Sequence, residues 1–322
     1  MDSERTLLIS QAAELACAME VLSPKPGNVS PGKPFKYLND MTFVASSIGL
    51  SEAFRDPGES VGKLVERAVR ATARLVGKNS NLGIILLLAP LARAANDILT
   101  GPDSLRQGGG ISAGNLRGAV KNVLAGLDGD DSSSIYRAIR SASPEGLGKS
   151  ERYDVTERGA DGGEGIFPPV MEAMRFASAW DSVAGEYATG YEITFGLTVP
   201  KLTSLWREGR TLRSSVVQTF LFVMSEVPDT LIARKLGAEV SNEVSRAARR
   251  SLGLGGCFSE DGRRAARDLT AMLDDRDNLM NPGTTADLVA AGIFVFLEDE
   301  LGRTPLPELL DGWDRKNETE ER

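Results

Sequence analysis

The chain has 322 residues and a mass of 34.4 kDa, enough to bury a core without disulfide or metal staples. Lys and Arg total 37 against 45 Asp and Glu, for a net charge of −8, and the basic residues are dispersed. This composition excludes a protein that binds nucleic acid through a basic surface. The sequence has no histidine, so acid–base chemistry and metal binding must use other side chains.

Several features indicate the cellular compartment. The two cysteines, Cys17 and Cys257, favour a reducing cytoplasm, although a structural disulfide stays open as the alternative. The start, Met1 to Arg5, is acidic and polar, unlike a signal peptide. The most apolar run, Leu82 to Leu91, is roughly half the ~20 residues of a membrane span. We therefore expect a cytoplasmic protein without membrane or nucleic-acid partners, and nothing in the sequence indicates an oligomeric state.

Helical periodicity accounts for most of the chain in order. The first helix is expected over Thr6 to Val21, ending before Pro24, and the second begins at Asn39 or Asp40 and continues through Phe54. The further expected helices are Val61 to Val76, one from near Asn79 through Ala89, Leu116 to Leu127, Ser132 to Ser141, Val170 to about Phe195, Val199 to Trp206, Leu212 to Ser225, Asp229 to Ser251, Gly262 to Leu273 and Thr284 to Leu301.

The pattern predicts an all-α fold, because no strand-like alternation or repeat is present. Leu82 to Ala89 is apolar on every side, so we expect it to be the buried central helix of a single large bundle of roughly ten or more helices. No composition shift divides the chain. Residues 1–316 are therefore predicted to form one catalytic domain, followed by a charged, disordered tail at 317–322.

Two polar stretches are interpreted as structural. Gly146 to Ser150 ends like a phosphate-binding loop, but Ser143 stands where the first glycine belongs and no strand precedes it, so we reject that interpretation. The surrounding glycine-rich segment, 143–168, is expected to be a lid or a disordered excursion. The acidic run Asp128, Asp130 and Asp131 is interpreted as a solvated helix cap rather than a metal site.

The stretch from Pro24 to Asn28 places a lysine between two prolines. The prolines fix φ on both sides of Lys25 and deny it a helix, Gly27 frees the backbone to turn, and Asn28 offers a donor and an acceptor. Taken alone, the stretch is a stiff connection between two helices. A second polar stretch near the far end of the chain favours a rigidly placed cation instead.

That second stretch is Asn281-Pro282-Gly283-Thr284-Thr285-Ala286-Asp287. It predicts a tight turn into a helix whose first amides and two hydroxyls can bind phosphate. The alternative is that Thr284 and Asp287 form a capping box and need no ligand.

Two more acidic residues stand near helices. Asp229 is expected at a helix start, with Arg234 and Lys235 about a turn and a half later, which helix capping explains. Asp181 is placed on an otherwise apolar helix, where an ionised side chain needs a partner such as Mg²⁺ or an arginine if it is buried.

Taken in order, these stretches resemble the triphosphoribosyl-dephospho-coenzyme A synthase family, whose best-known members make the precursor of the citrate lyase prosthetic group. The resemblance covers most of the chain. It rests on Glu20-Val21 with Pro24 to Val29, Asp40 to Phe43 with Ser46-Ser47, Asn79 to Gly83, Pro144 to Gly148 with Asp154-Val155, Asp181 ahead of Tyr187, Pro228 to Lys235, and Asn281 to Leu288.

The resemblance implies an all-helical enzyme that binds ATP with Mg²⁺. Such an enzyme transfers the triphosphoribosyl unit to the ribose 2′-hydroxyl of 3′-dephospho-coenzyme A and releases adenine. Members typically carry a histidine just before the Asp-Met pair and a His-Lys pair where this chain has Asn81-Leu82. With Leu38 and Leu82 in these regions, the chain resembles a divergent member acting on dephospho-coenzyme A or a related acceptor.

Cleavage of the N-glycosidic bond of ATP passes through an oxocarbenium-like state, which carboxylates near the ring stabilise. We expect Asp40, Asp181 and Asp287 to hold Mg²⁺ or stabilise the ribosyl cation, and one of them, or Glu20, to act as base. The expected ligand-binding residues are Lys25, Gly27, Asn28, Asn79, Asn81, Arg234, Lys235, Asn281, Gly283, Thr284 and Thr285. Two alternatives stay open: an ATP-dependent small-molecule kinase, or another nucleotide-using enzyme of cofactor biosynthesis, and a non-catalytic helical binding protein.

Overall fold

The structure, a computed structural model, describes residues 2–35, 38–78, 80–101, 110–143, 152–153, 167–274 and 277–312. All named elements in these ranges are helices, which confirms the all-α prediction. In chain order they are α1 (Asp2–Leu22), α2 (Asp40–Ala53), α3 (Val61–Val76), α4 (Leu82–Thr100), α5 (Ala113–Ala125), α6 (Gly129–Ala142), α7 (Val170–Ala177), α8 (Ser182–Thr189), η1 (Thr194–Thr198), α9 (Val199–Arg207), α10 (Leu212–Glu226), α11 (Thr230–Leu236), α12 (Ala238–Gly253), η2 (Gly256–Phe258), α13 (Glu260–Met272), α14 (Gly283–Leu301) and α15 (Leu306–Asp311). Most of segment 143–168, including the Gly146 to Ser150 motif, lies outside the described residues, as does the tail at 317–322.

The chain divides into two compact units. Unit 1 comprises residues 1–15 and 42–191, and unit 2 comprises residues 16–41 and 192–322. Helices α1 and α2 each continue from one unit into the other in sequence. That residues 1–316 act as one domain stays a prediction.

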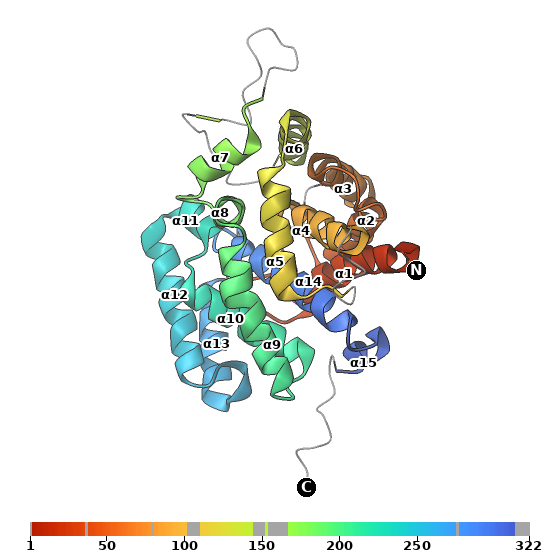
Figure 1. The fold of residues 1–322 in the computed structure, drawn as a ribbon. Helices are drawn as coiled ribbons and strands as arrows, with labels where there is room; N and C mark the ends of the chain where they lie inside the picture. Colours follow the sequence, from red (N-terminus) through yellow and green to blue (C-terminus); the bar gives the residue numbers. More distant parts are fainter. Residues whose placement is uncertain are drawn as a thin grey trace. The chain divides into compact units, whose positions relative to one another are not determined.

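Unit 1 is built around α4, which α3 and α5 contact in Figure 1. Pro90 inside α4 has no N–H, so the carbonyl of Leu86 lacks its helical donor. The buried hydroxyl of Tyr187 donates to that carbonyl at 2.7 Å, and Tyr191 donates to Leu87 at the same distance. Helix α4 is long and apolar enough to cross a membrane, but 72% of the 18-residue apolar stretch within it is buried inside the protein. This confirms the predicted buried helix within unit 1.

Local capping explains where unit 1 departs from the predicted helices. The helix expected over Val170 to Phe195 is wrong, because it is broken into α7, α8 and η1. Asp181 is the N-cap of α8, and its Oδ1 accepts from the amides of Val183 and Ala184 at 2.8 and 3.4 Å. Gly190, at φ 68°, ends α8. Asp181 therefore stands at a helix start rather than on an apolar helix face.

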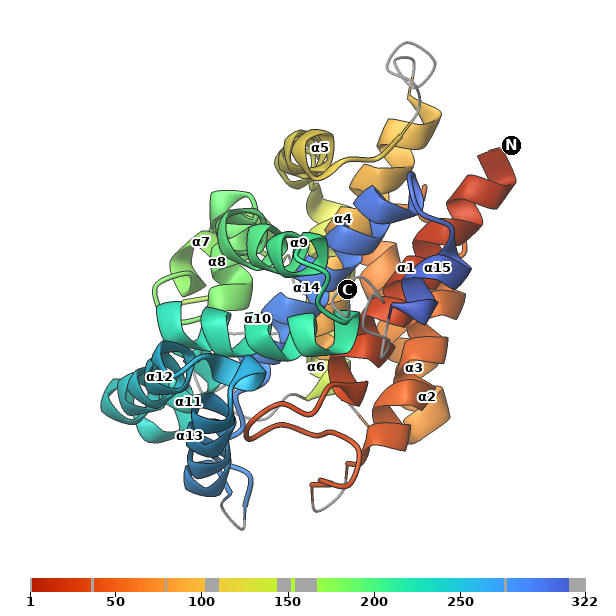
Figure 2. The same cartoon turned by 90° about the horizontal axis from the view of Figure 1, so that it is seen from below.

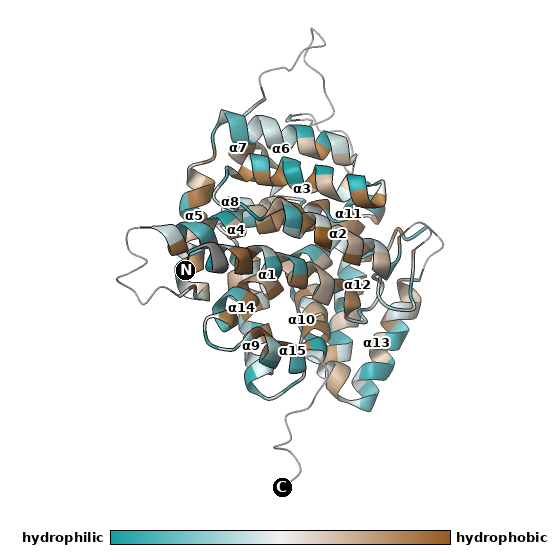
Figure 3. Ribbon diagram, turned by 90° about the vertical axis from the view of Figure 1, so that its right-hand side faces the viewer, coloured by the Kyte–Doolittle hydropathy of each residue, from teal (hydrophilic) through white to brown (hydrophobic). Residues whose placement is uncertain are grey.

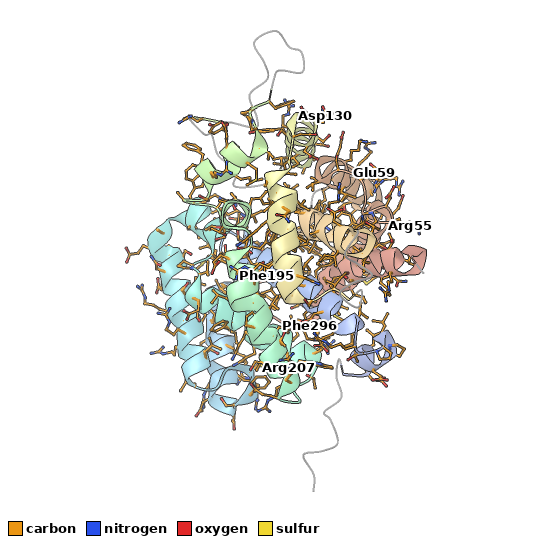
Figure 4. All side chains as sticks on the ribbon, in the orientation of Figure 1. Arg55, Glu59, Asp130, Phe195, Arg207 and Phe296 are labelled. Carbon is orange, nitrogen blue, oxygen red and sulfur yellow. The ribbon has the colours of Figure 1, made fainter. Side chains whose placement is uncertain are left out.

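The acidic run at the start of α6 is the helix cap that the sequence predicts. Asp128 accepts from the amides of Asp130 and Asp131 at 2.9 Å. Asp130 is exposed, and Figure 4 labels it at the start of α6. Asp131 is buried, however, and its Oδ1 accepts from the amide of Gly62 at 2.7 Å, which ties α6 to the first turn of α3.

Unit 2 has a buried helix of its own, α14, which packs against α9, α10 and η1. Phe296 of α14, labelled in Figure 4, contacts Trp206 of α9 edge to face, with ring centroids 6.0 Å apart. The more polar α13, with much teal in Figure 3, packs on α12. The expected helix over Asp229 to Ser251 is wrong, because Gly237 at φ 95° separates α11 from α12.

Candidate functional site

Lys25 and Glu20 form a buried ion pair in unit 2. The Lys25 Nζ lies 3.0 Å from Glu20 Oε1, and the two side chains are 0% and 4% exposed. The same ammonium donates to the carbonyl of Glu20 and, at 3.0 Å, to that of Ser23, and lies 5.9 Å from the ring centre of Phe220. Burial raises the pKa of Glu20 and lowers that of Lys25, and the charge of each partner opposes the shift of the other. The rigid lysine that the sequence predicts is thus surrounded by acceptors from its own segment.

The loop after Lys25 is fixed against the end of α13. Gly27 has φ 70°, and a Cβ added there would lie 2.5 Å from Cδ1 of Leu273. Asn28 is buried, and its Oδ1 accepts from the amide of Val29 at 2.7 Å. Figure 2 shows the loop running from the end of α1 toward α13. Farther along the loop, Lys33 Nζ lies 3.9 Å from Asp274 Oδ1. The loop is therefore a tightly seated structural element, as its prolines and glycine indicate.

Asp229 joins the N-termini of two helices. Its Oδ1 accepts from the amides of Leu231 and Ile232 in α11 at 2.9 and 3.0 Å. Its Oδ2 accepts from the amide and the hydroxyl of Thr285 in α14 at 2.7 and 2.8 Å. The residue is 2% exposed, and burial raises its pKa although these hydrogen bonds act in the opposite direction. The sequence predicts that Asp229 caps α11. It does not show that Asp229 also accepts hydrogen bonds from α14 or that it is buried.

This joint places the Asn281 to Asp287 stretch. The capping-box alternative is wrong, because Pro282 is the N-cap of α14 and Thr284 stands inside the helix, its Oγ1 3.3 Å from that of Thr230. A Cβ on Gly283 would lie 2.8 Å from Leu231, so the start of α14 packs closely on α11. The sequence assigns the N–H and the O–H of Thr285 to phosphate, but in the structure both donate to Asp229. Phosphate binding there stays a prediction.

The remaining predicted ligands of unit 2 lie near the same two helices. Arg234 and Lys235 are half-buried in the last turn of α11. Asn281 is half-buried just before α14, and its Oδ1 is buried without a hydrogen-bond partner. The structure thus gathers residues from Pro228 to Lys235 and from Asn281 to Asp287 through Asp229.

The three carboxylates predicted to hold Mg²⁺ come from three different helices. Asp40 is the first residue of α2, Asp287 lies in α14, and Asp181 caps α8. Among the described residues, no three Asp, Glu or Cys side chains lie close enough to hold a metal ion. The roles of Asp40, Asp181 and Asp287 stay predictions.

Unit 1 contains a cavity of about 100 Å³ at the start of α4, lined by residues that include Val69, Thr72, Lys78, Asn81, Ile85 and Ser141. Both polar atoms of the Asn81 side chain are buried without a hydrogen-bond partner, and so is Oγ1 of Thr72. Asn81 is the N-cap residue of α4, but its side chain makes no capping hydrogen bond. Asn79 lies outside the described residues. Leu82, where the resemblance places a polar residue, is the first residue of α4 and 7% exposed.

Two buried polar residues, Thr72 and Glu298, carried no signal in the sequence. Thr72 lies in the middle of α3, an amphipathic helix that the sequence predicts without any sign of a site, and only the cavity marks it. Glu298 of α14 is 5% exposed, its Oε1 has no hydrogen-bond partner, and burial raises its pKa to about 8. Helix α14 contains four acidic residues, Asp287, Glu298, Asp299 and Glu300, and the sequence does not show how deeply Glu298 is buried.

Comparison with known proteins gives a consistent result. The family described as "CitG: ATP:dephospho-CoA triphosphoribosyl transferase" matches residues 6–305. Two curated relatives carry the name "Probable 2-(5''-triphosphoribosyl)-3'-dephosphocoenzyme-A synthase". The protein from Lactiplantibacillus plantarum is 25% identical over 92% of this chain and 99% of its own length. The protein from Stutzerimonas stutzeri is 28% identical over 85% of each.

A solved structure from Archaeoglobus fulgidus, whose name places it with the triphosphoribosyl-dephospho-CoA synthases, has the same fold. It superposes with a TM-score of 0.58 and 24% identity over 80% of this chain and 98% of its own.

Proposed function

This chain belongs to the ATP:dephospho-CoA triphosphoribosyl transferase family, and on that premise we propose that it moves the triphosphoribosyl group of ATP to a ribose hydroxyl of 3′-dephospho-CoA or a related acceptor. The observation that carries the proposal is the family match across residues 6–305, which includes every stretch discussed above. Relatives that align over 85–92% of the chain support it further.

The reaction sets the chemistry that the protein must supply. The bond between C1′ of the ribose and the base nitrogen breaks, its electron pair leaves with adenine, and the acceptor oxygen bonds to C1′. The hydroxyl proton leaves the acceptor and is balanced by the proton that neutral adenine carries away. Positive charge develops at C1′, so carboxylates near the ring and donors near the base lower the barrier.

The residues that the sequence singles out are proposed to serve these needs. Asp40, Asp181 and Asp287 are the proposed carboxylates near the ribose, with Glu20 as a further candidate for the base. Arg234 and Lys235 are the proposed phosphate contacts, because they lie half-buried beside the α11–α14 joint. Lys25 takes part only if an arriving phosphate replaces an acceptor that now surrounds it, and its ion pair with Glu20 otherwise holds the loop.

Mg²⁺ is proposed to accompany ATP. Mg²⁺ is commonly held by one or two carboxylates together with substrate phosphates rather than by a complete protein cage. In that mode one or two of the proposed carboxylates suffice, and the ion screens the triphosphate charge.

The test is to incubate the full chain with ATP, Mg²⁺ and 3′-dephospho-CoA and to separate the products by chromatography. We expect adenine and a dephospho-CoA product enlarged by the triphosphoribosyl group. Formation of ADP in place of adenine would contradict the proposal and favour a kinase. Adenine release only with a different hydroxyl-bearing cofactor would keep the transfer chemistry and identify the related acceptor.

A further inference from the structure

The cavity at the start of α4 is built from unit 1 alone. It lies where the end of α3, the start of α4 and the end of α6 meet. Its volume of about 100 Å³ exceeds the space of one water and is of the same order as an engineered cavity of about 150 Å³ that takes a benzene ring. Since the cavity is smaller than the one that takes benzene, it can hold one edge of a planar bicyclic base and not the whole base.

The polar end of this cavity is unsatisfied. Asn81 is 2% exposed, and neither its amide oxygen nor its amide nitrogen has a hydrogen-bond partner. Thr72, also 2% exposed, has an unpartnered hydroxyl and lines the same cavity. Buried polar groups are nearly always paired, so these three polar atoms are available to pair with a ligand or a water that enters the cavity.

The backbone around Asn81 is held in place. Gly77, at φ 74°, ends α3 in a left-handed cap. Ser80 Oγ lies 2.6 Å from Ser46 Oγ of α2. The carbonyl of Asn81 accepts the first intrahelical hydrogen bond of α4, from Ile85 at 2.9 Å. The amide side chain is thus presented by a fixed turn rather than by a loose loop.

The residues that line the cavity determine which kind of ligand it can bind. Val69, Ala73, Ile85 and Ala142 supply apolar walls, and Lys78 and Ser141 add polar side chains to the lining. Asn81 supplies a donor and an acceptor side by side. That pair matches the edge of adenine, which offers an amino donor next to a ring-nitrogen acceptor. A phosphate offers acceptors only and would leave the amide oxygen unpaired.

We propose that this cavity receives the amino edge of the adenine base of ATP, with the Asn81 amide paired to that edge and the Thr72 hydroxyl to a further ring nitrogen. This inference rests on the proposed function, because it names where the leaving base is held. Pairing that strengthens as the base takes the electron pair of the breaking bond lowers the barrier to its departure.

The test measures binding of free adenine to the full chain by calorimetry, with tripolyphosphate as a separate ligand. Asn81→Leu removes both polar atoms, and the fold loses no side-chain cap by it. We expect it to weaken adenine binding about 10- to 100-fold and leave tripolyphosphate binding unchanged. Thr72→Val should weaken adenine binding about 3- to 10-fold. Thr270→Val is the matched control, because its hydroxyl only bonds the carbonyl of Ala266 on α13.

Purine, which lacks the amino group, sharpens the result. The unaltered protein should prefer adenine over purine by about tenfold, and Asn81→Leu should abolish that preference. If the unaltered protein and both cavity variants bind adenine equally, the inference is overturned and the cavity is assigned to water. If ATP is still turned over in that case, the proposed function remains intact. Binding of neither adenine nor ATP would overturn both.

Discussion

Replacing Asp229 with asparagine is expected to loosen the joint between α11 and α14. The carboxylate accepts four hydrogen bonds, two through each oxygen. Asparagine keeps the oxygen that serves α11, but its amide nitrogen would face the Thr285 amide, donor against donor. The Thr285 hydroxyl can rotate to accept, whereas its backbone N–H cannot.

The magnitude follows from that single orphaned donor. A buried N–H without a partner costs about 1–3 kcal/mol. An opposing effect exists, because burial raises the pKa of Asp229 and asparagine removes the cost of burying a charge. We expect the orphaned donor to dominate, since the four hydrogen bonds offset part of the cost of burying the charge, and predict a net loss of about 1–3 kcal/mol at neutral pH.

Urea unfolding of Asp229→Asn checks this value, with Thr285→Val as the matched variant. Valine removes the hydroxyl and keeps the backbone N–H, so it should cost only about 0.5–1.5 kcal/mol. Because the folded pKa of Asp229 is raised above 3.8, the stability of the unaltered protein relative to Asp229→Asn should decrease as pH rises through that folded pKa. A neutral or stabilising Asp229→Asn would refute the reasoning and show that burying the charge outweighs its hydrogen bonds.

Three further predictions concern unit 2. Lys25→Met should cost about 3–5 kcal/mol in thermal unfolding because it leaves a buried carboxylate unpaired, and adding Glu20→Leu should recover most of the loss. Gly27→Ala should cost about 1–3 kcal/mol through its positive φ and the contact with Leu273, and Leu273→Ala should lessen that penalty in a double-mutant cycle; simple additivity would contradict the contact. Burial raises the pKa of Glu298 from 4.5 to about 8, so the stability of the unaltered protein should fall between these pH values by at most about 1.4 kcal/mol per unit, and denaturant unfolding of Glu298→Gln should lack that fall.

Most of the fold is readable from the sequence where apolar periodicity is strong. The predicted limits of Val61 to Val76 match α3, and the predicted buried run from Leu82 is the core of α4. The errors lie where a single residue caps or separates helices inside a continuous periodic pattern. Asp181 and Gly237 do this, and periodicity alone does not distinguish such a break from a helix that tolerates the residue.

Long-range polar pairing limits what the sequence tells about the site. The cap at Asp229 follows from local spacing, but its second set of hydrogen bonds reaches Thr285, 56 positions away. In the same way, the sequence identifies Lys25 as a fixed cation without showing that Glu20 is buried beside it. Residue type and order predict which stretches matter, and only packing decides which groups are already paired.

That distinction separates two kinds of polar residue in this chain. Lys25, Asp229 and Thr285 are buried with acceptors or donors from the protein itself, so their replacement is expected to act first on stability. Asn81 and Thr72 are equally buried but lack such partners. Their replacement should therefore change the free energy of unfolding of the ligand-free protein little and weaken ligand binding instead. Measuring stability and adenine affinity in the same variants therefore discriminates residues that hold the fold from residues that hold the substrate.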